Sequence, residues 1–537
     1  MADDDPDDAA TIPTTSTDVL VIGGGIGGLA AALALQRHGL RVLVYERDAH
    51  CEQRKGYGLT LSNVSALAAL GVEDECRAIN SSCVSDCHWV FDAGGAVLGY
   101  FGIAFTKKLH EQRGNLRVPR LVLRRTLFER LAPNSVRWGW RCVGYDDDGS
   151  GVTALFERAP AGSGEPAAAS EARVAVRCSV LVGADGVRSV CRALKFGDPH
   201  RYVGVVVVLG LCALHHPLLH CQGFYTLDGQ HRLFTMPYEP LDEQETAPPA
   251  DGGGGGEASG GASGGRHSTM WQISLALADE AAARALCAGG GAALLAEMVR
   301  RCGHWHPPVP AMLAATHEAS VWGTPLYDRE PMPLRRKNRL GGPAPWSSRV
   351  TLLGDAAHCM TPFKGQGANQ ALADAPLLAT YLAPALLASD GGDAPGGDTP
   401  SGGKSRTERI ASALACFERE MTSRSEAKVR ASRAAAKHFH SPAALDLDGQ
   451  LIEGVADTAR LLAAMRAEGV GARCAGELEA RAIALQGALA SSHPEDASPD
   501  PVGVAVPKSD VPVGLGVAAR GGGADLEACQ RAAAQVS

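Results

Sequence analysis

The feature that most constrains this chain is a strand–helix–strand unit close to its start. The run Asp18–Gly24 is apolar and β-branched, which predicts a buried strand. The Ala/Leu-rich run Gly28–His38 predicts a helix, and Leu40–Glu46 predicts a second apolar strand. Two parallel strands joined by a helix begin a doubly wound sheet that is covered by helices. We therefore predict an α/β fold with a Rossmann-type first domain.

The turn between the first strand and the helix is rich in glycine and fits the pattern G-x-G-x-x-G at Gly23, Gly25 and Gly28. In such a turn the first glycine permits the tight bend, the second lets the backbone approach a pyrophosphate, and the third lets the helix pack closely on the strand. The free N–H groups and the positive dipole end of the helix favour phosphate. The pattern predicts a dinucleotide site that contains Gly23, Gly25, Ile26, Gly27 and Gly28.

An acidic residue, Glu46, ends the second predicted strand about twenty residues after the turn, as this fingerprint expects. An acid at this position can accept hydrogen bonds from the hydroxyls of the adenosine ribose. It also disfavours a 2′-phosphate, which argues against NADP in this particular pocket. We assign Glu46 and the adjacent Arg47 to the predicted dinucleotide site.

A second motif lies far along the chain, at residues 352–369. Its apolar strand ends in Gly354-Asp355, and a glycine-rich loop, Gly365–Asn369, precedes another helix. A carboxylate at a strand end can hold a ribityl or ribose hydroxyl. The N–H groups at the start of the helix suit the negative charge that a reduced flavin carries at its N1–C2=O edge. The segment alone is compatible with a simple helix cap, but together with the first motif it indicates a flavin.

A third apolar strand ends in Gly-Ala-Asp-Gly at residues 183–186. Alone, this segment is compatible with an ordinary Asp-Gly turn.

The three motifs, in this order, resemble the dinucleotide fingerprint, the Asp-Gly motif and the Gly-Asp motif of the FAD-dependent aromatic hydroxylases. These are the group A flavoprotein monooxygenases, which include p-hydroxybenzoate hydroxylase, salicylate hydroxylase and zeaxanthin epoxidase. Residues 54–63 resemble the family's segment after the ribose acid, and residues 124–131 resemble its helix with an arginine near the flavin. The resemblance covers roughly residues 18–440 and is strong in the cofactor domain but weak in the substrate domain.

The resemblance implies roles for individual residues. Arg124 would contact the linker region of the flavin, and Asp185 with Gly186 would lie near the FAD pyrophosphate and the nicotinamide entry path. Asp355 would bind a ribose or ribityl hydroxyl. The remaining residues of the implied site are Arg54, whose spacing is less regular, and Pro362, Gly365, Gly367, Ala368 and Asn369 around the isoalloxazine.

The resemblance also implies the reaction of a single-component monooxygenase. NAD(P)H would reduce FAD, O₂ would add to the flavin C4a, and the distal oxygen of that hydroperoxide would hydroxylate or epoxidise a small organic substrate. The cofactor supplies the chemistry while the protein positions it and excludes water. No catalytic side chain is therefore assigned, and His358 is interpreted as a packing or hydrogen-bonding residue.

Other flavoproteins share this fold, and fold does not decide among them. The main alternative is an FAD-dependent reductase or dehydrogenase of the geranylgeranyl reductase type. Halogenases typically show Trp-x-Trp-x-Ile-Pro, whereas Trp138-Gly-Trp140 is followed by Arg and Cys, and the Gly-Gly-Arg segment of amine oxidases is not present after Glu46. A non-catalytic flavin-binding protein, which would act through its C-terminal region, also stays open.

The rest of the chain indicates a mostly antiparallel second sheet that is interleaved with the first domain. The strand-like runs are His88–Asp92, Val97–Phe101, Val203–Ala213, Gly223–Leu227, Arg232–Pro237 and Met270–Leu275. The composition of 245–266 and 389–404 predicts flexible insertions, and 410–438 predicts a long helix. The predicted organisation is a disordered tail at 1–17, an FAD-binding domain at 18–87, 112–200 and 345–388, a substrate domain at 88–111 and 201–344, and a helical C-terminal region with a disordered tail at 405–537.

Composition argues against several classes of partner. The 537 residues carry a formal net charge of −8, and nucleic-acid binding rests on a basic footprint, so we expect no nucleic acid. No apolar run reaches the roughly 18–20 residues of a spanning helix, so we expect no transmembrane segment. The first seventeen residues are acidic and show no basic flank followed by an apolar core, so we do not expect them to be a secretory signal. We expect a cytoplasmic location, with an organelle left open. The cysteines and histidines show no second ligand pair at zinc spacing, so no metal is expected.

Overall fold

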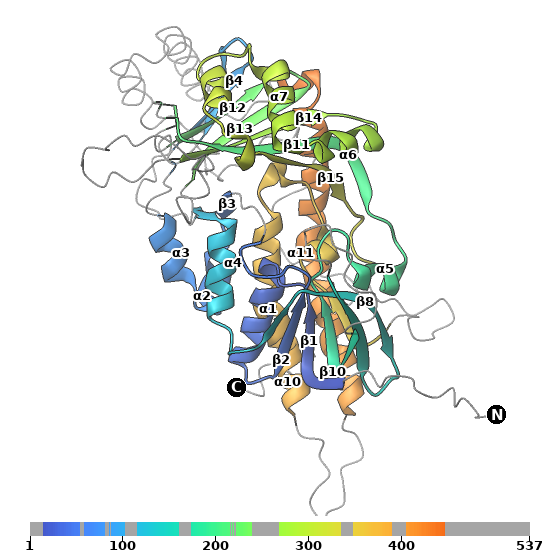
Figure 1. Cartoon of the computed structure of the whole chain (residues 1–537). Helices are drawn as coiled ribbons and strands as arrows, with labels where there is room; N and C mark the ends of the chain where they lie inside the picture. The colour runs from blue at the N-terminus through green and yellow to red at the C-terminus, as the bar shows by residue number, and fades with distance from the viewer. Residues whose placement is uncertain are drawn as a thin grey trace, which may run out of the picture.

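The structure is a computed structural model that describes residues 14–53, 58–80, 85, 87–101, 115–159, 173–214, 216, 218–219, 222–238, 268–333, 347–388 and 404–445. Its strands form two seven-stranded sheets and one two-stranded sheet, with helices beside both large sheets (Figure 1). Several predicted features lie outside the described residues. They are Arg54, the insertion expected at 245–266, the insertion expected at 389–404 apart from Lys404, and residues 446–537.

The first large sheet contains β1 (Thr14–Ile22), β2 (Val42–Glu46), β7 (Val136–Trp138), β8 (Trp140–Asp147), β9 (Val152–Arg158), β10 (Arg173–Gly183) and β16 (Val350–Leu352). Its strand order is β7-β2-β1-β10-β9-β8, and β16 also pairs with β10. The strands β7, β2, β1 and β10 pair in parallel, and β16 pairs in parallel with β10. Beyond β10, the strands β9 and β8 extend the sheet in antiparallel fashion. The α/β class and the strand–helix–strand unit at its start are therefore as predicted.

The first strand begins earlier than the sequence suggested. Residues Thr14–Thr17, which we assigned to a disordered tail, pair in register with Ala175–Cys178 of β10. Threonine is β-branched and suits a pleated strand, and the long β10 offers it a partner.

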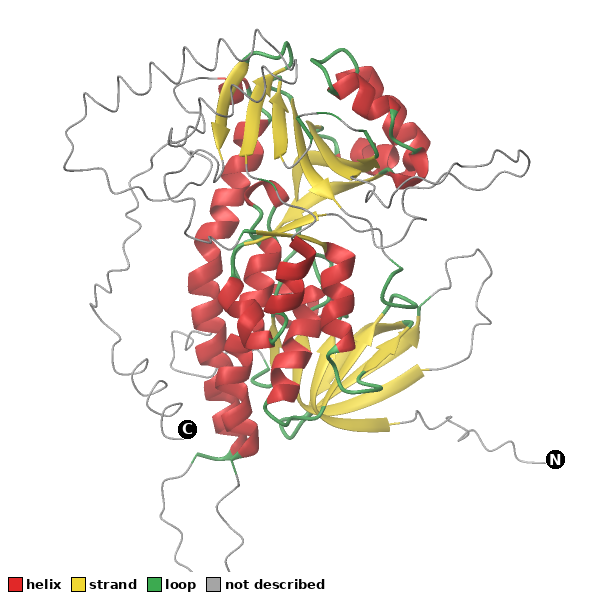
Figure 2. Cartoon of the chain, turned by 90° about the vertical axis from the view of Figure 1, so that its left-hand side faces the viewer, coloured by secondary structure: helices red, strands yellow, loops and turns green. Residues whose placement is uncertain are grey.

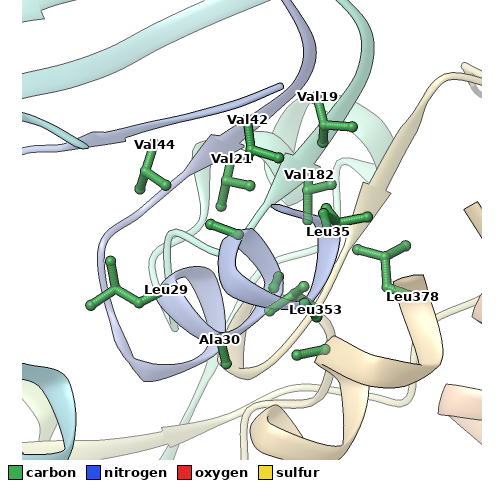
Figure 3. Close-up of a cluster of buried hydrophobic side chains, with 14 of the residues drawn as sticks. Val19, Val21, Leu29, Ala30, Leu35, Val42, Val44, Val182, Leu353 and Leu378 are labelled. Carbon is green, nitrogen blue, oxygen red and sulfur yellow. The ribbon is translucent and has the colours of Figure 1, made fainter. Parts of the chain in front are cut away.

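In the first domain α1 packs on the parallel strands, and other helices pack on α1 or on one another. The helices of this domain are α1 (Ile26–Arg37), α2 (Val64–Leu70), α3 (Glu73–Asn80), α4 (Arg120–Glu129), α5 (Val190–Phe196), α9 (Asp355–His358) and α10 (Gly367–Leu387), with the small sheet of β3 (Gly58–Leu61) and β6 (Leu116–Pro119) beside them. Figure 3 shows Leu35 of α1 between Val182 of the sheet and Leu378 of α10, with Leu29 on another side of the helix. All four side chains are fully buried, so α1 forms the centre of this core.

The second large sheet contains β4 (Cys87–Asp92), β5 (Val97–Phe101), β11 (Arg201–Cys212), β12 (Gln222–Leu227), β13 (His231–Tyr238), β14 (Ser268–Ala276) and β15 (Trp322–Asp328). Its order is β15-β11-β14-β13-β12-β4-β5, and every pair is antiparallel except β12 with β4. This arrangement confirms the predicted antiparallel second sheet. The strand β15 was not predicted.

The two faces of this sheet have different neighbours. The outer face packs against α6 (Glu280–Ala288), α7 (Gly290–Cys302) and α8 (Val309–Ala314), with the 3₁₀ turn η3 (Glu318–Ser320) beside them. The inner face packs against η4 (Pro362–Lys364), η5 (Pro442–Leu445) and the long helix α11 (Arg406–Phe439). Among the described residues no single helix is long and apolar enough to cross a membrane; α6 and α7 meet that test only as a pair bent by 116°.

The helix α11 joins the two halves of the molecule. Its first turn is fixed by a capping box, in which Ser405 and Glu408 bond each other's backbone N–H groups. From there it runs beside α10 toward the second sheet, where Phe439 is buried in the inner-face core (Figures 1 and 2). The long helix predicted from the sequence is therefore also the main link between the domains.

Candidate functional site

The glycine-rich turn is shaped by close backbone approaches. Gly23 has φ +109°, and a Cβ there would lie 2.4 Å from the carbonyl oxygen of Ala184. A Cβ on Gly28 would lie 1.9 Å from the carbonyl oxygen of Gly23. A Cβ on Gly25 would meet nothing within 4 Å, so open space lies in front of the first turn of α1. Gly23 and Gly28 are thus required by the fold, because any side chain there would collide with backbone. Gly25 instead borders open space that a ligand can occupy.

The acid at the end of β2 lies directly beside this turn. The Glu46 carboxylate accepts the Gly24 N–H at 2.5 Å and the Asp48 N–H at 2.9 Å, one on each oxygen. The side chain is buried, but each carboxylate oxygen can accept a further hydrogen bond. The neighbouring Arg47 is exposed. The predicted ribose acid is therefore held rigidly at the turn.

Arg124 supports the same turn from within the protein. Its guanidinium donates to the carbonyl oxygen of Gly24 at 2.8 Å, to the carbonyl oxygen of Cys51 at 2.9 Å and to Asp48 Oδ2 at 2.9 Å. It also lies 5.2 Å from the ring centroid of Trp138. Because only 1% of the residue is exposed, the structure favours a supporting role for it over direct contact with a ligand.

The Asp-Gly motif packs on the glycine-rich turn. Asp185 accepts hydrogen bonds from the Ser189 hydroxyl at 2.5 Å and from the backbone N–H groups of Val190 and Cys191 at 2.7 and 3.2 Å. Desolvation raises its pKa even so. Gly186 follows with φ +78°, and a Cβ there would meet nothing within 4 Å. This motif therefore caps α5 and leaves an open backbone position next to it.

The Gly-Asp motif carries an exposed acid beside the start of a helix. Asp355 is solvent-exposed, and desolvation by the surrounding protein raises its pKa. The carboxylate also lies near the start of α10, since a Cβ on Gly367 would be 3.8 Å from Asp355 Oδ1. The second motif thus places an acid and a helix N-terminus together.

The loop before α10 has an accessible side and an anchored side. Pro362 and Gly365 are exposed, Gly367 and Ala368 are partly exposed, and Gly365 has φ +60° with nothing within 4 Å of a Cβ. Asn369 is buried; it donates to the carbonyl oxygens of Thr60 and Gly365, both at 2.8 Å, and accepts the N–H groups of Ser62 and Asn63. Asn369 therefore holds the loop in place instead of facing the accessible side.

Sequence reasoning missed the group that anchors the Gly-Asp turn. Asp374 on α10 is fully buried and accepts the Gly354 N–H at 2.9 Å and His358 Nε2 at 2.8 Å on one oxygen, while Arg424 of α11 pairs with the other. An acid within an apolar helix was the available signal. His358 is thus a hydrogen-bonding residue, as interpreted from the sequence.

The three predicted motifs converge, and their open positions fit one extended ligand. Gly23 contacts the Asp-Gly motif, and a Cβ on Gly27 would lie 2.9 Å from Leu353 Cδ1, next to the Gly-Asp motif. Open backbone positions at Gly25, Gly186 and Gly365 border this junction together with the N-termini of α1 and α10. The N–H groups of two helix N-termini can donate to phosphates and to an anionic ring edge, and the two carboxylates can accept from sugar hydroxyls.

Comparisons with known proteins agree with this geometry. Residues 16–199 and 346–393 match the family model described as FAD binding domain. The aurachin C monooxygenase/isomerase of Stigmatella aurantiaca is 28% identical over 392 residues, which are 70% of this chain and 84% of that protein. A 3-amino-4-hydroxybenzoate 2-monooxygenase of Streptomyces platensis is 30% identical over 380 residues, which are 69% of this chain and 81% of that protein.

The chain belongs to the FAD-dependent aromatic hydroxylase family of flavoprotein monooxygenases. It is accordingly an oxidoreductase with FAD as its cofactor. Among solved structures, Klebsiella pneumoniae HpxO complexed with FAD and uric acid matches 80% of this chain and 90% of that chain, with a TM-score of 0.57 and 24% identity. This likeness shows that the two chains share a fold.

Proposed function

We propose that this protein is a single-component monooxygenase that consumes NAD(P)H and O₂ and transfers one oxygen atom to a small organic substrate by hydroxylation or epoxidation. The observation that carries the proposal is the convergence of the three glycine-rich motifs, which contact one another around the N-termini of α1 and α10. Bound FAD supplies the electron transfer and the oxygen activation.

The chain's own residues bind and orient the cofactor in this proposal. Gly25 and the first turn of α1 receive the pyrophosphate, Glu46 receives the adenosine ribose, and Asp355 receives a ribityl or ribose hydroxyl. The N–H groups at the start of α10 face the isoalloxazine edge and stabilise negative charge there. Arg124 and Asn369 position these segments through their backbone contacts.

Exclusion of water is the second task of the chain. The inner face of the second sheet carries apolar side chains such as Met236 and Met270, which pack together with Phe363 of η4. Met236 lies so close to Gly58 of β3 that a Cβ there would be 2.5 Å from the Met236 Cε. An apolar cover of this kind slows the unproductive decay of an oxygenating flavin.

The decisive experiment is turnover under ¹⁸O₂ with purified yellow holoprotein and a panel of phenols, polyketides and terpenoids. We expect NAD(P)H oxidation, consumption of O₂ and a product heavier by one labelled oxygen atom. A reductase or dehydrogenase of the same fold would use the same cofactor site, so only the fate of oxygen separates the two. A product without label, or equal turnover without O₂, would establish the reductase instead.

A further inference from the structure

Arg192 of α5 holds the backbone of the Gly-Asp motif from inside the protein. The residue is fully buried, and its Nη1 donates to the carbonyl oxygens of Ala356 and Ala357 at 3.2 and 2.5 Å. These residues directly follow Asp355, the acid of the motif, within the single turn of α9. The carbonyl oxygens of so short a helix have no partners within it, so they depend on donors from elsewhere. Arg192 supplies those donors.

Arg329 holds the Asp-Gly motif in a similar way. It directly follows β15, only 3% of it is exposed, and its Nε and Nη2 donate to the carbonyl oxygen of Val187 at 3.3 and 3.1 Å. Val187 comes next after Gly186, the open backbone position of that motif. Desolvation lowers the pKa of Arg329, and the nearby charge of Arg192 lowers it further. Two cations thus lie close together in the interior.

One carboxylate, that of Asp198, accepts hydrogen bonds from both arginines. Arg192 donates to it from Nε at 2.9 Å and from Nη2 at 2.5 Å. Arg329 Nη1 lies 3.4 Å from the same carboxylate and 2.6 Å from the Asp198 carbonyl oxygen. Within the described ranges, no other carboxylate forms an ion pair with either arginine. Removing the one acid that neutralises buried guanidinium groups is strongly unfavourable, so Asp198 keeps both cations in place.

Asp198 lies where the chain passes from one large sheet to the other. It stands between α5 of the first domain and β11 of the second sheet, while Arg329 begins the segment that leads back from β15 to β16. Arg192 Nη2 also donates to the carbonyl oxygen of Glu330, in that returning segment, at 2.9 Å. All five N–H donors of Arg192 therefore have acceptors. These two connections between the sheets are fastened to the two motifs through the same pair of arginines.

A second buried acid fixes the backbone next to Arg329. Asp328, the last residue of β15, is 1% exposed and pairs with Arg201 of β11 at 3.1 Å and with Arg433 of α11 at 2.5 Å. Arg433 also donates to the carbonyl oxygen of Arg329 at 3.2 Å. The path of the chain at Arg329 is thus held without Asp198. A change at Asp198 should therefore act on the guanidinium groups and leave the strands in place.

We propose that Asp198 is a positioning residue for bound FAD. It holds Arg192 and Arg329, and these arginines place the backbone of the Gly-Asp and Asp-Gly motifs where the cofactor binds. The inference rests on the proposed function, because that function assigns Asp355 of the Gly-Asp motif to a sugar hydroxyl of FAD. It is independent of the reaction that the flavin then carries out.

The test compares variants of two acids that differ in what their arginines hold. Asp198→Asn removes the charge and keeps one acceptor, whereas Asp198→Glu restores the charge. Asp18→Asn is the matched control, because Asp18 also accepts two N–H groups of one arginine, Arg41, and its side chain is 24% exposed against 29% for Asp198. Arg41 is exposed, so this control loses only a surface ion pair.

Apoprotein of each variant is titrated with FAD. Asp198→Asn should bind FAD about tenfold more weakly, because ordering even one loosened backbone residue costs about that factor in affinity. Asp198→Glu should recover part of the loss, and Asp18→Asn should bind like the original protein. At saturating FAD, the visible circular dichroism and the midpoint reduction potential of the flavin should differ between Asp198→Asn and the original protein. A merely structural ion pair would lower the melting temperature and leave both flavin properties unchanged.

The outcomes decide the inference without NAD(P)H or a substrate. If FAD affinity, circular dichroism and potential were the same in Asp198→Asn as in Asp18→Asn, Asp198 would not position the cofactor, even if labelled oxygen reached a product. If Asp198→Asn fails to fold, Arg329→Lys decides. It keeps the charge but loses the planar fork that joins Val187 to Asp198, and it should show the same weaker binding and altered dichroism. Normal values there would overturn the inference, whereas failed ¹⁸O₂ turnover would bear only on the proposed reaction.

Discussion

The two large sheets contribute to the same site by different physical means. The first sheet contributes backbone: Gly23 and Gly28 are required because any side chain would collide with neighbouring backbone oxygens. The second sheet contributes side chains: Tyr225, Arg232 and Gln272 project from adjacent strands toward η4 and α11. In the proposed function, cofactor binding would thus depend on where glycine is unavoidable, and substrate binding would depend on the side chains that the strands of the second sheet carry.

This difference predicts which of the two halves should tolerate sequence change. Where a side chain would collide with backbone, only glycine fits. Few positions in the first domain are therefore restricted, but those positions accept no other residue. A strand position of the second sheet accepts any side chain of suitable size, so its face can be adapted to a new substrate without loss of the fold. The predictions below test this contrast, beginning with the largest expected effect.

The first domain has one exception to this contrast, because the buried side chain of Asp374 anchors the Gly-Asp turn, and this exception should give the largest effect. Asp374→Ala leaves Arg424 and His358 without their acceptor in the interior, which should lower the free energy of unfolding by about 3–5 kcal/mol and release FAD. Tyr381→Phe is the control: it removes an exposed α10–α11 hydrogen bond to Glu420 and should cost at most about 1.5 kcal/mol. Urea unfolding and flavin content measure both, and equal losses would contradict the assignment.

In the substrate half, stability should depend on pH through His440, at the end of α11. Desolvation lowers its pKa to about 4, and its ring bonds the Ser274 hydroxyl of β14 at 2.9 Å. Because the pKa in the folded state lies below the ordinary value, the stabilisation is complete above about pH 6.5 and is lost as the pH falls toward 4.

The loss should approach about 3 kcal/mol, since one pKa unit corresponds to about 1.4 kcal/mol. His440→Gln cannot take up this proton, so its unfolding free energy should fall less between pH 6.5 and pH 4. Chemical unfolding at several pH values measures the difference. Parallel pH profiles for the two proteins would show that His440 does not carry the effect.

The same contrast explains what the sequence could predict. The cofactor motifs were recognisable because backbone constraints require glycine at fixed spacing, as at Gly23, Gly25 and Gly28. The six strand-like runs of the second sheet were also found, because burial on one or both faces favours aromatic and β-branched residues. Element boundaries differed by a few residues, most at β1, where pairing with β10 decides the start.

Other parts of the site could not be predicted because they depend on tertiary contacts. Asp374 and Arg424 are fifty residues apart in sequence, and nothing local signals their pairing. Arg232 reads as an ordinary strand residue until its aromatic neighbours from η4 and α11 are known. Arg124 was expected near the flavin linker, but its three bonds to the protein are visible only in the fold.

The contrast within the glycine-rich turn can be sharpened with two matched alanine variants. Gly28→Ala places a Cβ 1.9 Å from the Gly23 oxygen and should destabilise the apoprotein by about 1–3 kcal/mol. Gly25→Ala meets nothing within 4 Å, so its apoprotein should stay within about 0.5 kcal/mol of the original, while FAD affinity falls because the methyl group occupies the proposed pyrophosphate space. Unfolding curves measure the stability of the two apoproteins, and FAD titrations measure their affinities. An equal loss of stability in both variants would contradict the prediction.

The smallest expected effect concerns Asp355, where cofactor binding and apoprotein stability should respond in opposite directions. Desolvation raises the pKa of this carboxyl, so the apoprotein has its full stability below the ordinary carboxyl pKa of about 4 and loses some as the pH rises through the raised value. Asp355→Asn cannot ionise, and at neutral pH its apoprotein should be more stable by less than about 1 kcal/mol, because an exposed carboxylate keeps much of its hydration. FAD should nevertheless bind it about tenfold more weakly, since a charged acceptor for a sugar hydroxyl is lost.

Melting curves of the apoprotein at pH 4 and pH 8 measure the stability, and FAD titrations measure the affinity. If the variant were less stable as apoprotein and bound FAD normally, Asp355 would be a structural residue, and the cofactor half would resemble the substrate half in relying on side-chain packing.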